Sequence, residues 1–160
     1  MLDAIKRFFE QNLSPRLRES AQDEDRRLRL ATAALLIQVM TVDDRIEEDE
    51  QRAVARSLRS KFRLTDQETA ALVAVAREAA SQATSDYEFT SLLKQGFNME
   101  QRVKVVEHLW HVAFADGNLD KHEEHLVRRI ADLLYVPHSE FIRTKLKVKR
   151  ETAMPRGGGA

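Results

Sequence analysis

The chain has 160 residues, a length that suits one domain of ordinary size with a hydrophobic core of its own. Its 26 basic and 26 acidic residues cancel, so the molecule as a whole lacks the charge excess with which proteins coat nucleic acid or an anionic membrane. The absence of cysteine excludes disulfides, thiolate metal sites and a cysteine nucleophile. No stretch is apolar enough to span a membrane and the N-terminus lacks a signal-peptide core, so we expect a cytoplasmic protein.

Helix-breaking residues are rare in the body of the chain. Prolines occur only at positions 15, 137 and 155, and glycines only at 96, 117 and 157–159. A β-fold with many tight turns needs more of both, whereas the apolar residues recur here at spacings of three and four. The sequence therefore predicts an all-α protein, a single-domain pseudo-symmetric bundle of seven to eight helices.

The expected elements follow from this periodicity and from capping signals. Residues 1–22 form an amphipathic helix and a linker, because the residue before Pro15 is pushed out of the helical conformation. Residues 23–150 form the helical domain, and the glycine-rich residues 151–160 form a disordered tail. Gly96 is expected to end the fifth helix as a left-handed cap. The helices expected within the domain cover about 23–41, 47–62, 65–82, 85–96, 98–115, 120–134 and 137–149.

An internal repeat organises the domain. Residues 36–50 align with residues 109–123, and in each an apolar helix runs into the motif Asp-x-x-(Ile/Leu)-(Asp/Glu)-x-x-Glu before a new amphipathic helix begins. Residues 64–68 align with residues 136–140, so the repeated unit covers about 33–68 and 106–140. Neither half buries its apolar face alone, which predicts two acidic turns at equivalent positions of one bundle.

The acidic turns are the candidate functional segments. Between residues 41 and 50, six carboxylates face one arginine. Glu50 and Glu123 fall on apolar stripes at helical spacing, so both are expected on the buried side of the first turn of their helices. A carboxylate left there without a partner costs several kcal/mol, so each needs one.

Helix capping is one way to satisfy these carboxylates. Asp120 at the N-cap and Glu123 three residues later are suited to satisfy backbone amides reciprocally, as a capping box. Glu47 and Glu50 form a weaker version, because glutamate is a poor N-cap residue. The residue pattern by itself favours this interpretation.

Binding of a divalent cation is the other way to satisfy these carboxylates. Carboxylate oxygens suit a hard cation such as calcium, magnesium or manganese, although the ligand spacing of an EF-hand is absent. The converging pairs would be Asp43 with Glu50, and Asp116 with Glu123.

Histidines also flank the second turn, but they make zinc a weaker candidate. Their spacing is compatible with zinc, yet no HExxH motif exists and the first repeat carries Gln38 and Asp49 at the places of two of them. No phosphate-binding loop, nucleophile elbow or serine–histidine–acid arrangement is present, so we expect no enzyme activity. The four histidines are His108, His111, His122 and His125.

The two ends carry the remaining patterns. An apolar stripe runs along residues 1–13 and is widened by Phe8; it is expected to dock on its own domain, with peripheral membrane contact as the lesser alternative. Residues 140–150 carry a balance of plus four, which complements a helix C-terminus. No aromatic residue follows Phe141, so no nucleic-acid partner is expected.

The second repeat resembles the signature of a known family. Residues 112–124, Val-Ala-Phe-Ala-Asp-Gly-Asn-Leu-Asp-Lys-His-Glu-Glu, and the helix through residues 130–134 are similar to the tellurite-resistance TerB family, which also forms the N-terminal region of a membrane-anchored DnaJ-like co-chaperone. The resemblance covers about residues 24–148. The first repeat departs from it with Asp44 in place of the glycine, which predicts a differently shaped turn.

The resemblance implies an all-helical fold of seven or eight helices with internal pseudo-symmetry, and divalent metal at the acidic turns. It implies a non-enzymatic protein of the tellurite or metal stress response that acts through protein partners. The alternative is a metal-independent interaction scaffold whose acidic surface docks a basic partner. Carried over residue by residue, the metal role falls on Asp116, Asp120 and Glu123, and through the repeat on Asp43, Glu47 and Glu50.

Overall fold

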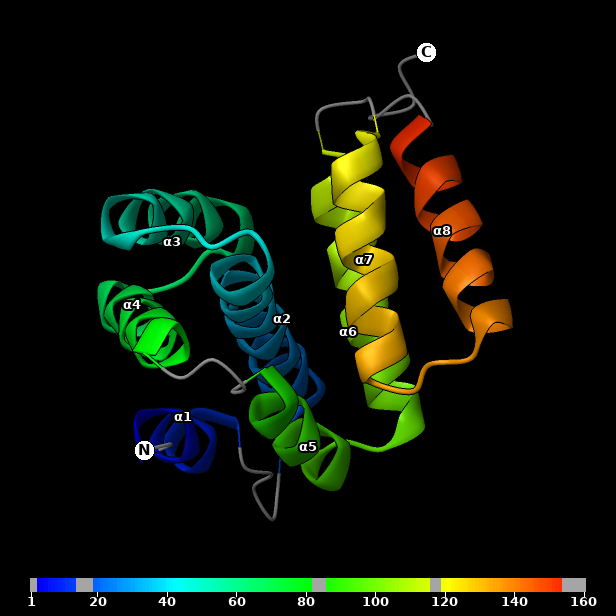
Figure 1. Cartoon of the computed structure of the whole chain (residues 1–160). Helices are drawn as coiled ribbons and strands as arrows, with labels where there is room; N and C mark the ends of the chain where they lie inside the picture. The colour runs from blue at the N-terminus through cyan, green and yellow to red at the C-terminus, as the bar shows by residue number, and fades with distance from the viewer. Residues whose placement is uncertain (1–2, 14–18, 82–85, 116–118, 154–160) are drawn as a thin grey trace. The chain divides into compact units, whose positions relative to one another are not determined.

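The structure is a computed structural model that describes residues 3–13, 19–81, 86–115 and 119–153 (Figure 1). All regular elements within these ranges are helices, which confirms the predicted all-α class. The chain divides into two compact units, Met1–Asn98 and Met99–Ala160. The elements are α1 (Asp3–Phe8), a π-helical segment η1 (Phe9–Leu13), α2 (Ala21–Asp43), α3 (Glu48–Phe62), α4 (Asp66–Ser81), α5 (Asp86–Gly96), α6 (Met99–Ala113), α7 (Lys121–Leu133) and α8 (His138–Ala153).

The first unit is built around α2. This helix starts after Ser20, whose hydroxyl accepts the backbone N–H of Asp23 at 3.0 Å as an N-cap. From residue 27 to residue 39 nearly every side chain is buried, as expected for a helix that is apolar on all sides. In Figure 1, α2 lies beside α3 and α4, and it also contacts α5 and η1. Within the described ranges, no helix is long and apolar enough to cross a membrane.

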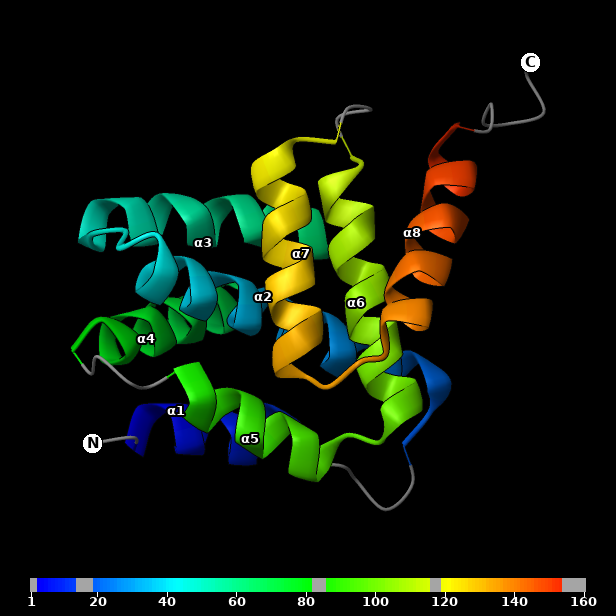
Figure 2. The same cartoon turned by 45° about the vertical axis from the view of Figure 1, so that its right-hand side comes forward.

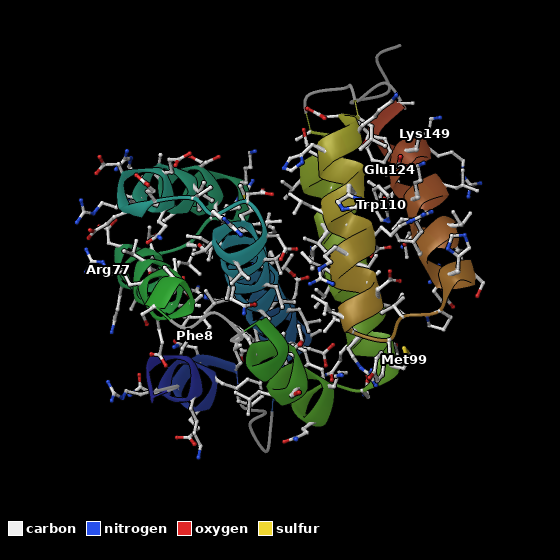
Figure 3. The ribbon with its side chains drawn as sticks, viewed as in Figure 1. Phe8, Arg77, Met99, Trp110, Glu124 and Lys149 are labelled. Atoms are coloured by element: carbon white, nitrogen blue, oxygen red, sulfur yellow. The ribbon has the colours of Figure 1, made fainter. Side chains whose placement is uncertain are left out.

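The N-terminal segment packs into the core of the first unit. Phe8, labelled in Figure 3, is 4% exposed, and its ring centroid lies 6.2 Å from that of Phe89. Leu13 is fully buried, and the Phe9 ring lies 6.5 Å from that of Phe97. The apolar stripe along this segment therefore has an intramolecular partner.

A buried arginine holds this segment to α2. The Arg27 guanidinium is paired with the carboxylate of Glu19 through two hydrogen bonds of 2.7 and 2.8 Å. It also donates to the carbonyl of Leu13 at 3.0 Å and lies 5.0 Å from the centroid of the Phe97 ring. Arg27 is 6% exposed, so three hydrogen bonds and an aromatic ring accompany a charged group in the core.

Gly96 has a different role from the predicted left-handed cap. It is the last residue of α5 and its backbone is not left-handed. A Cβ at this position would lie 2.5 Å from Cζ of Phe9, too close for two carbon atoms. Glycine is therefore required by the close approach of the Phe9 ring, and this contact is not visible in the local sequence.

We expect Gly96→Ala to lower the free energy of unfolding by about 1 kcal/mol, because overpacking against Phe9 outweighs the higher helix propensity of alanine. In a Phe9→Ala background the same change should be neutral or stabilising, since the obstructing ring is gone. Urea unfolding of the four proteins gives the coupling directly. Equal effects of Gly96→Ala in both backgrounds would show that the two residues do not press on each other.

The described part of the second unit consists of three helices. Figure 2 shows α6 between α7 and α8, and α6 contacts both. Trp110 of α6 is fully buried, with its ring centroid 5.1 Å from that of Phe141 and 5.8 Å from that of Phe114. At the other end of α6, Arg102 donates to the carbonyl of Leu134 at 2.8 Å. The aromatic cluster thus joins α8 to α6, while Arg102 joins α6 to the end of α7.

The internal repeat is visible in the helix order and in the helix ends. The order α2, α3, α4 corresponds to α6, α7, α8, and each of the first helices contacts the two that follow it. Arg63 after α3 and Tyr135 after α7 are both left-handed, with φ of 54° and 56°. The next residue, Leu64 or Val136, is buried and donates its N–H back to the last turn at 3.0 Å. Both helices therefore end in the same Schellman-type cap.

Candidate functional site

The first acidic turn connects α2 to α3. Asp44 follows the last residue of α2, and its N–H donates to the carbonyl of Met40 at 3.0 Å. Asp44 has an ordinary φ of −94°, and the left-handed residue of the turn is Arg45, with a φ of 53°. The position that aligns with the glycine of the second repeat therefore does not need a glycine here.

Glu47 and Glu50 act as the cap of α3. Glu47 is the N-cap residue, and its backbone N–H donates to the Glu50 carboxylate at 3.1 Å within a capping box. The predicted burial of Glu50 is wrong, because its side chain is exposed. The stripe assumed from the sequence began at Ile46, which lies before the helix and does not set its phase. The buried face of α3 is formed instead by Gln51, Ala55, Leu58 and Phe62.

Gln51 is a polar residue of this turn that the sequence analysis missed. Its side chain is 3% exposed, and its amide N–H donates to the carbonyl of Ile46 at 3.1 Å. It therefore fastens the acidic turn to the buried face of α3. The signal available in the sequence was its spacing of four and seven residues before Ala55 and Leu58.

The second acidic turn precedes α7. Asp120 is the N-cap residue, as predicted, and its carboxylate accepts the N–H of His122 at 2.7 Å. The predicted capping box required the N–H of Glu123 in place of that of His122, so this part of the prediction is wrong. Glu123 lies in the first turn of α7 and is half-buried. The apolar stripe behind it, which includes Leu126 and Ile130, is buried as predicted. Asp116 lies outside the described residues.

A partly exposed ion pair joins the first turn of α7 to α8. Glu124 of α7 is paired with the ammonium of Lys145 from α8, which lies 5.8 Å from the centroid of the Trp110 ring. Figure 3 labels Glu124 and Trp110 in this part of the second unit. Glu124 aligns with Gln51 of the first repeat, but the two residues have different contacts: Gln51 donates to a backbone carbonyl of the acidic turn, whereas Glu124 pairs with a lysine of α8. The pair could not be predicted from the sequence, because Glu124 and Lys145 are on different helices.

The described carboxylates and histidines do not form a ready metal site. Among the residues that the structure describes, no three side chains of histidine, aspartate or glutamate are gathered so that they could hold a metal ion. Asp43, Glu47 and Glu50 are therefore not brought together. Asp120 and Glu123 both lie at the start of α7. The third predicted ligand, Asp116, lies outside the described residues, so the metal-binding role of these three residues stays a prediction.

The histidines give no better set. His111, His122 and His125 are exposed and His108 is half-buried. All four are among the described residues, and they take part in no group of three or more side chains that could hold a metal ion.

Comparison with known families places both turns in one domain. The model of a family described as tellurite resistance protein TerB matches residues 29–146, which begins inside α2 and ends inside α8. The chain belongs to the TerB family. The TerB match contains both acidic turns, both Schellman-type caps and Trp110, and it confirms the resemblance seen in the second repeat. Comparisons with curated proteins and with solved structures give no match.

The segment before the TerB match is attached to the family helices by the contacts of the first unit. Arg27 and Glu19 both precede residue 29, as do Phe8 and Leu13. The N-terminal residues of this TerB protein therefore form a packed segment of the first unit. The acidic turns are not part of this segment.

Proposed function

We propose that this TerB protein binds a divalent cation at its second acidic turn and acts without catalysis, through protein partners, in the response to tellurite or metal stress. The observation that carries the choice of turn is the difference between the two glutamates. Glu50 is exposed and its carboxylate accepts a backbone N–H, whereas Glu123 is held half-buried in the first turn of α7. A half-buried carboxylate beside a second acid is better placed to bind a cation than an exposed one, because water competes less for the ion.

The chemistry of the second turn suits a hard cation. The predicted ligands Asp116, Asp120 and Glu123 offer only oxygen atoms, as calcium, magnesium and manganese prefer. Asp120 uses Oδ1 to accept the N–H of His122, and its other carboxylate oxygen can serve an ion at the same time. Capping and metal binding are thus compatible at this residue, and the two interpretations of the sequence need not exclude each other.

Replacing the second-turn carboxylates should abolish cation binding. We expect isothermal titration calorimetry and native mass spectrometry to detect calcium, magnesium or manganese on the wild type and none on Asp116→Asn plus Glu123→Gln. Asp120→Ser is the sharper variant, since serine keeps the N-cap and removes the charge. It should weaken binding at least about tenfold while the melting temperature of the metal-free protein stays near that of the wild type.

The matched control is Glu47→Gln plus Glu50→Gln, which removes two carboxylates at the equivalent positions of the first turn. This control should bind the cation as the wild type does. Wild-type protein that binds none of these cations, or an Asp120→Ser variant that binds as tightly as the wild type, would contradict the proposal.

A metal-independent scaffold is the second candidate, and the exposure of the first turn favours it. Asp43, Asp44 and Glu47 are all exposed, so a basic partner can reach them. Under this alternative a chelator leaves the melting temperature unchanged, because no ion stabilises the fold. Capture of the partner then weakens with added salt.

A further inference from the structure

The N-terminal segment, residues 3–13, docks on the first unit through one face. It consists of α1 and η1, which contact α2, α4 and α5, and Figure 1 shows α1 beside α4. Phe8, labelled in Figure 3, and Leu13 are buried, whereas Lys6 and Glu10 are exposed. The segment is therefore an amphipathic helical piece whose apolar side packs against the helices that follow it in the first unit.

The surface that receives the segment is matched to its aromatic residues. The ring centroid of Phe8 lies 6.2 Å from that of Phe89, and the ring centroid of Phe9 lies 6.5 Å from that of Phe97. At Gly96 a Cβ atom would lie 2.5 Å from Cζ of Phe9, so this position has room for the ring only because it lacks a side chain. We call the residues that receive the segment the docking surface: Arg27, Phe89, Gly96 and Phe97.

One arginine of the docking surface also holds both ends of the connection to α2. The guanidinium of Arg27 donates to the carbonyl of Leu13 at 3.0 Å, and it donates to the carboxylate of Glu19 at 2.7 and 2.8 Å. Five residues, 14–18, separate these two, and one of them is Pro15, which disfavours a helical conformation in the residue before it. A short connection with both ends fixed at one point restricts how the segment folds back on its own chain, and short connections under strain favour exchange between copies.

The burial of the segment decides which occupant the docking surface can take. Phe8 is 4% exposed, Leu13 is fully buried, and the carbonyl of Leu13 is bound by a buried arginine. A helix from an unrelated protein would have to displace all of these contacts. The same segment from another copy replaces each contact with an identical one, so a second copy is the partner that this surface fits.

We propose that two copies of this chain exchange their N-terminal segments, so that residues 3–13 of each dock on the first unit of the other. In this dimer Arg27 keeps Glu19 of its own chain and donates to the carbonyl of Leu13 of the partner subunit. Because the exchange is reciprocal, both docking surfaces are filled and association stops at the dimer. The described carboxylates of the acidic turns take no part in it, so the exchange does not depend on the proposed cation binding.

The monomer and the exchanged dimer contain the same contacts of the segment, so the connection sets the balance between them. On its own chain, a segment with a short flexible connection has an effective concentration of about 1 mM. Dimer should therefore appear as the protein concentration approaches about 1 mM, and at lower concentration if the connection resists folding back. Buried side chains must leave the docking surface in each exchange, so the dimer should dissociate slowly after dilution.

Size-exclusion chromatography with light scattering, run directly after dilution of the full chain, tests the proposal. We expect a dimer fraction on the order of half in wild-type protein kept at about 1 mM. Deletion of residues 14–18 leaves only Glu19 and Ser20 between η1 and α2, so the segment can no longer fold back as it does in the wild type. This shortened chain should be dimeric at about 10 µM, a concentration about a hundredfold lower. Insertion of five Gly and Ser residues after position 18 is the control and should not raise the dimer fraction.

Two substitutions in the shortened chain show whether its dimer uses the docking surface. Leu13→Asp places a charge where the segment is fully buried, so it should return the shortened chain to a monomer. Gln11→Asp makes the same change of charge at an exposed position of the same segment and should leave the dimer intact.

Three outcomes would overturn the proposal. The wild type stays monomeric at about 1 mM, the shortened chain folds as a monomer, or its dimer survives Leu13→Asp, which would assign the contact to another surface. If the shortened chain does not fold, the same two substitutions in the full-length chain at about 1 mM decide, because Leu13→Asp must lose the dimer and Gln11→Asp must keep it.

Discussion

Replacing Arg27 by methionine is expected to lower the free energy of unfolding by about 3–5 kcal/mol, because it breaks a buried ion pair from one side. The guanidinium binds both oxygens of Glu19, whose side chain is 12% exposed, and the carbonyl of Leu13. Methionine fills much of the volume but leaves the carboxylate without its cation and the carbonyl without its donor. Urea unfolding followed by circular dichroism measures the loss.

Two further variants separate the ion pair from the packing. Arg26→Met removes the neighbouring arginine, which is more than half exposed and pairs with Glu68 at 3.4 Å, and it should change stability by less than about 1 kcal/mol. Arg27→Met plus Glu19→Met should recover most of the loss, since no charge then stays buried. If Arg27→Met costs no more than Arg26→Met, the N-terminal segment is not held by this pair.

The Arg27 cluster also bears on how this chain differs from a bare TerB domain. Glu19, Arg27 and Leu13 precede the family match, yet they lie in or against the core of the first unit. A variant that loses this anchor therefore tests whether the TerB helices of the first unit stay folded when the segment before them is released. The described carboxylates of the two acidic turns take no part in the cluster, so the proposed cation binding at the second turn should survive the loss.

Features that depend on neighbours within one helix turn could be predicted from the sequence. The capping box at the start of α4 is present, with the N–H of Thr65 donating to Glu68 at 2.8 Å and the N–H of Glu68 donating to the Thr65 hydroxyl at 3.0 Å. Asp120 caps α7 in the same local way. These contacts join residues at most three positions apart, so the order of residues specifies them.

Features that depend on distant residues, or on where a helix begins, could not be predicted. The burial of α3 follows from its start at Glu48, and a stripe counted from Ile46 put Glu50 on the wrong side. Gly96 is explained by Phe9, which is far away in the chain. For the candidate site, the sequence identified the capping roles of Glu47, Glu50 and Asp120. It could not reveal that Gln51 holds the first turn, or that Glu124 of α7 pairs with Lys145 of α8.

Trp110→Ala is expected to lower the stability of the second unit by about 3–5 kcal/mol, because it leaves a cavity in the contact between α6 and α8. Trp110 is fully buried against Phe114 and Phe141, and it aligns with Ile37, which is fully buried in α2. The same position thus fills the core in both repeats. Urea unfolding should be followed by circular dichroism, since Trp110 is the single tryptophan of the chain and its fluorescence is lost.

Trp110→Phe separates the contribution of ring packing to stability from that of the indole N–H. The buried indole Nε1 has no hydrogen-bond partner among the described residues, so phenylalanine removes an unsatisfied donor while it keeps an aromatic ring next to Phe141. We expect this variant to lose less than half of what Trp110→Ala loses. His111→Ala, at the exposed neighbouring position, should have little effect. A large loss in Trp110→Phe would mean that stability depends on the size of the indole and on its interaction with Lys145 over its ring, because phenylalanine is smaller and attracts a cation more weakly.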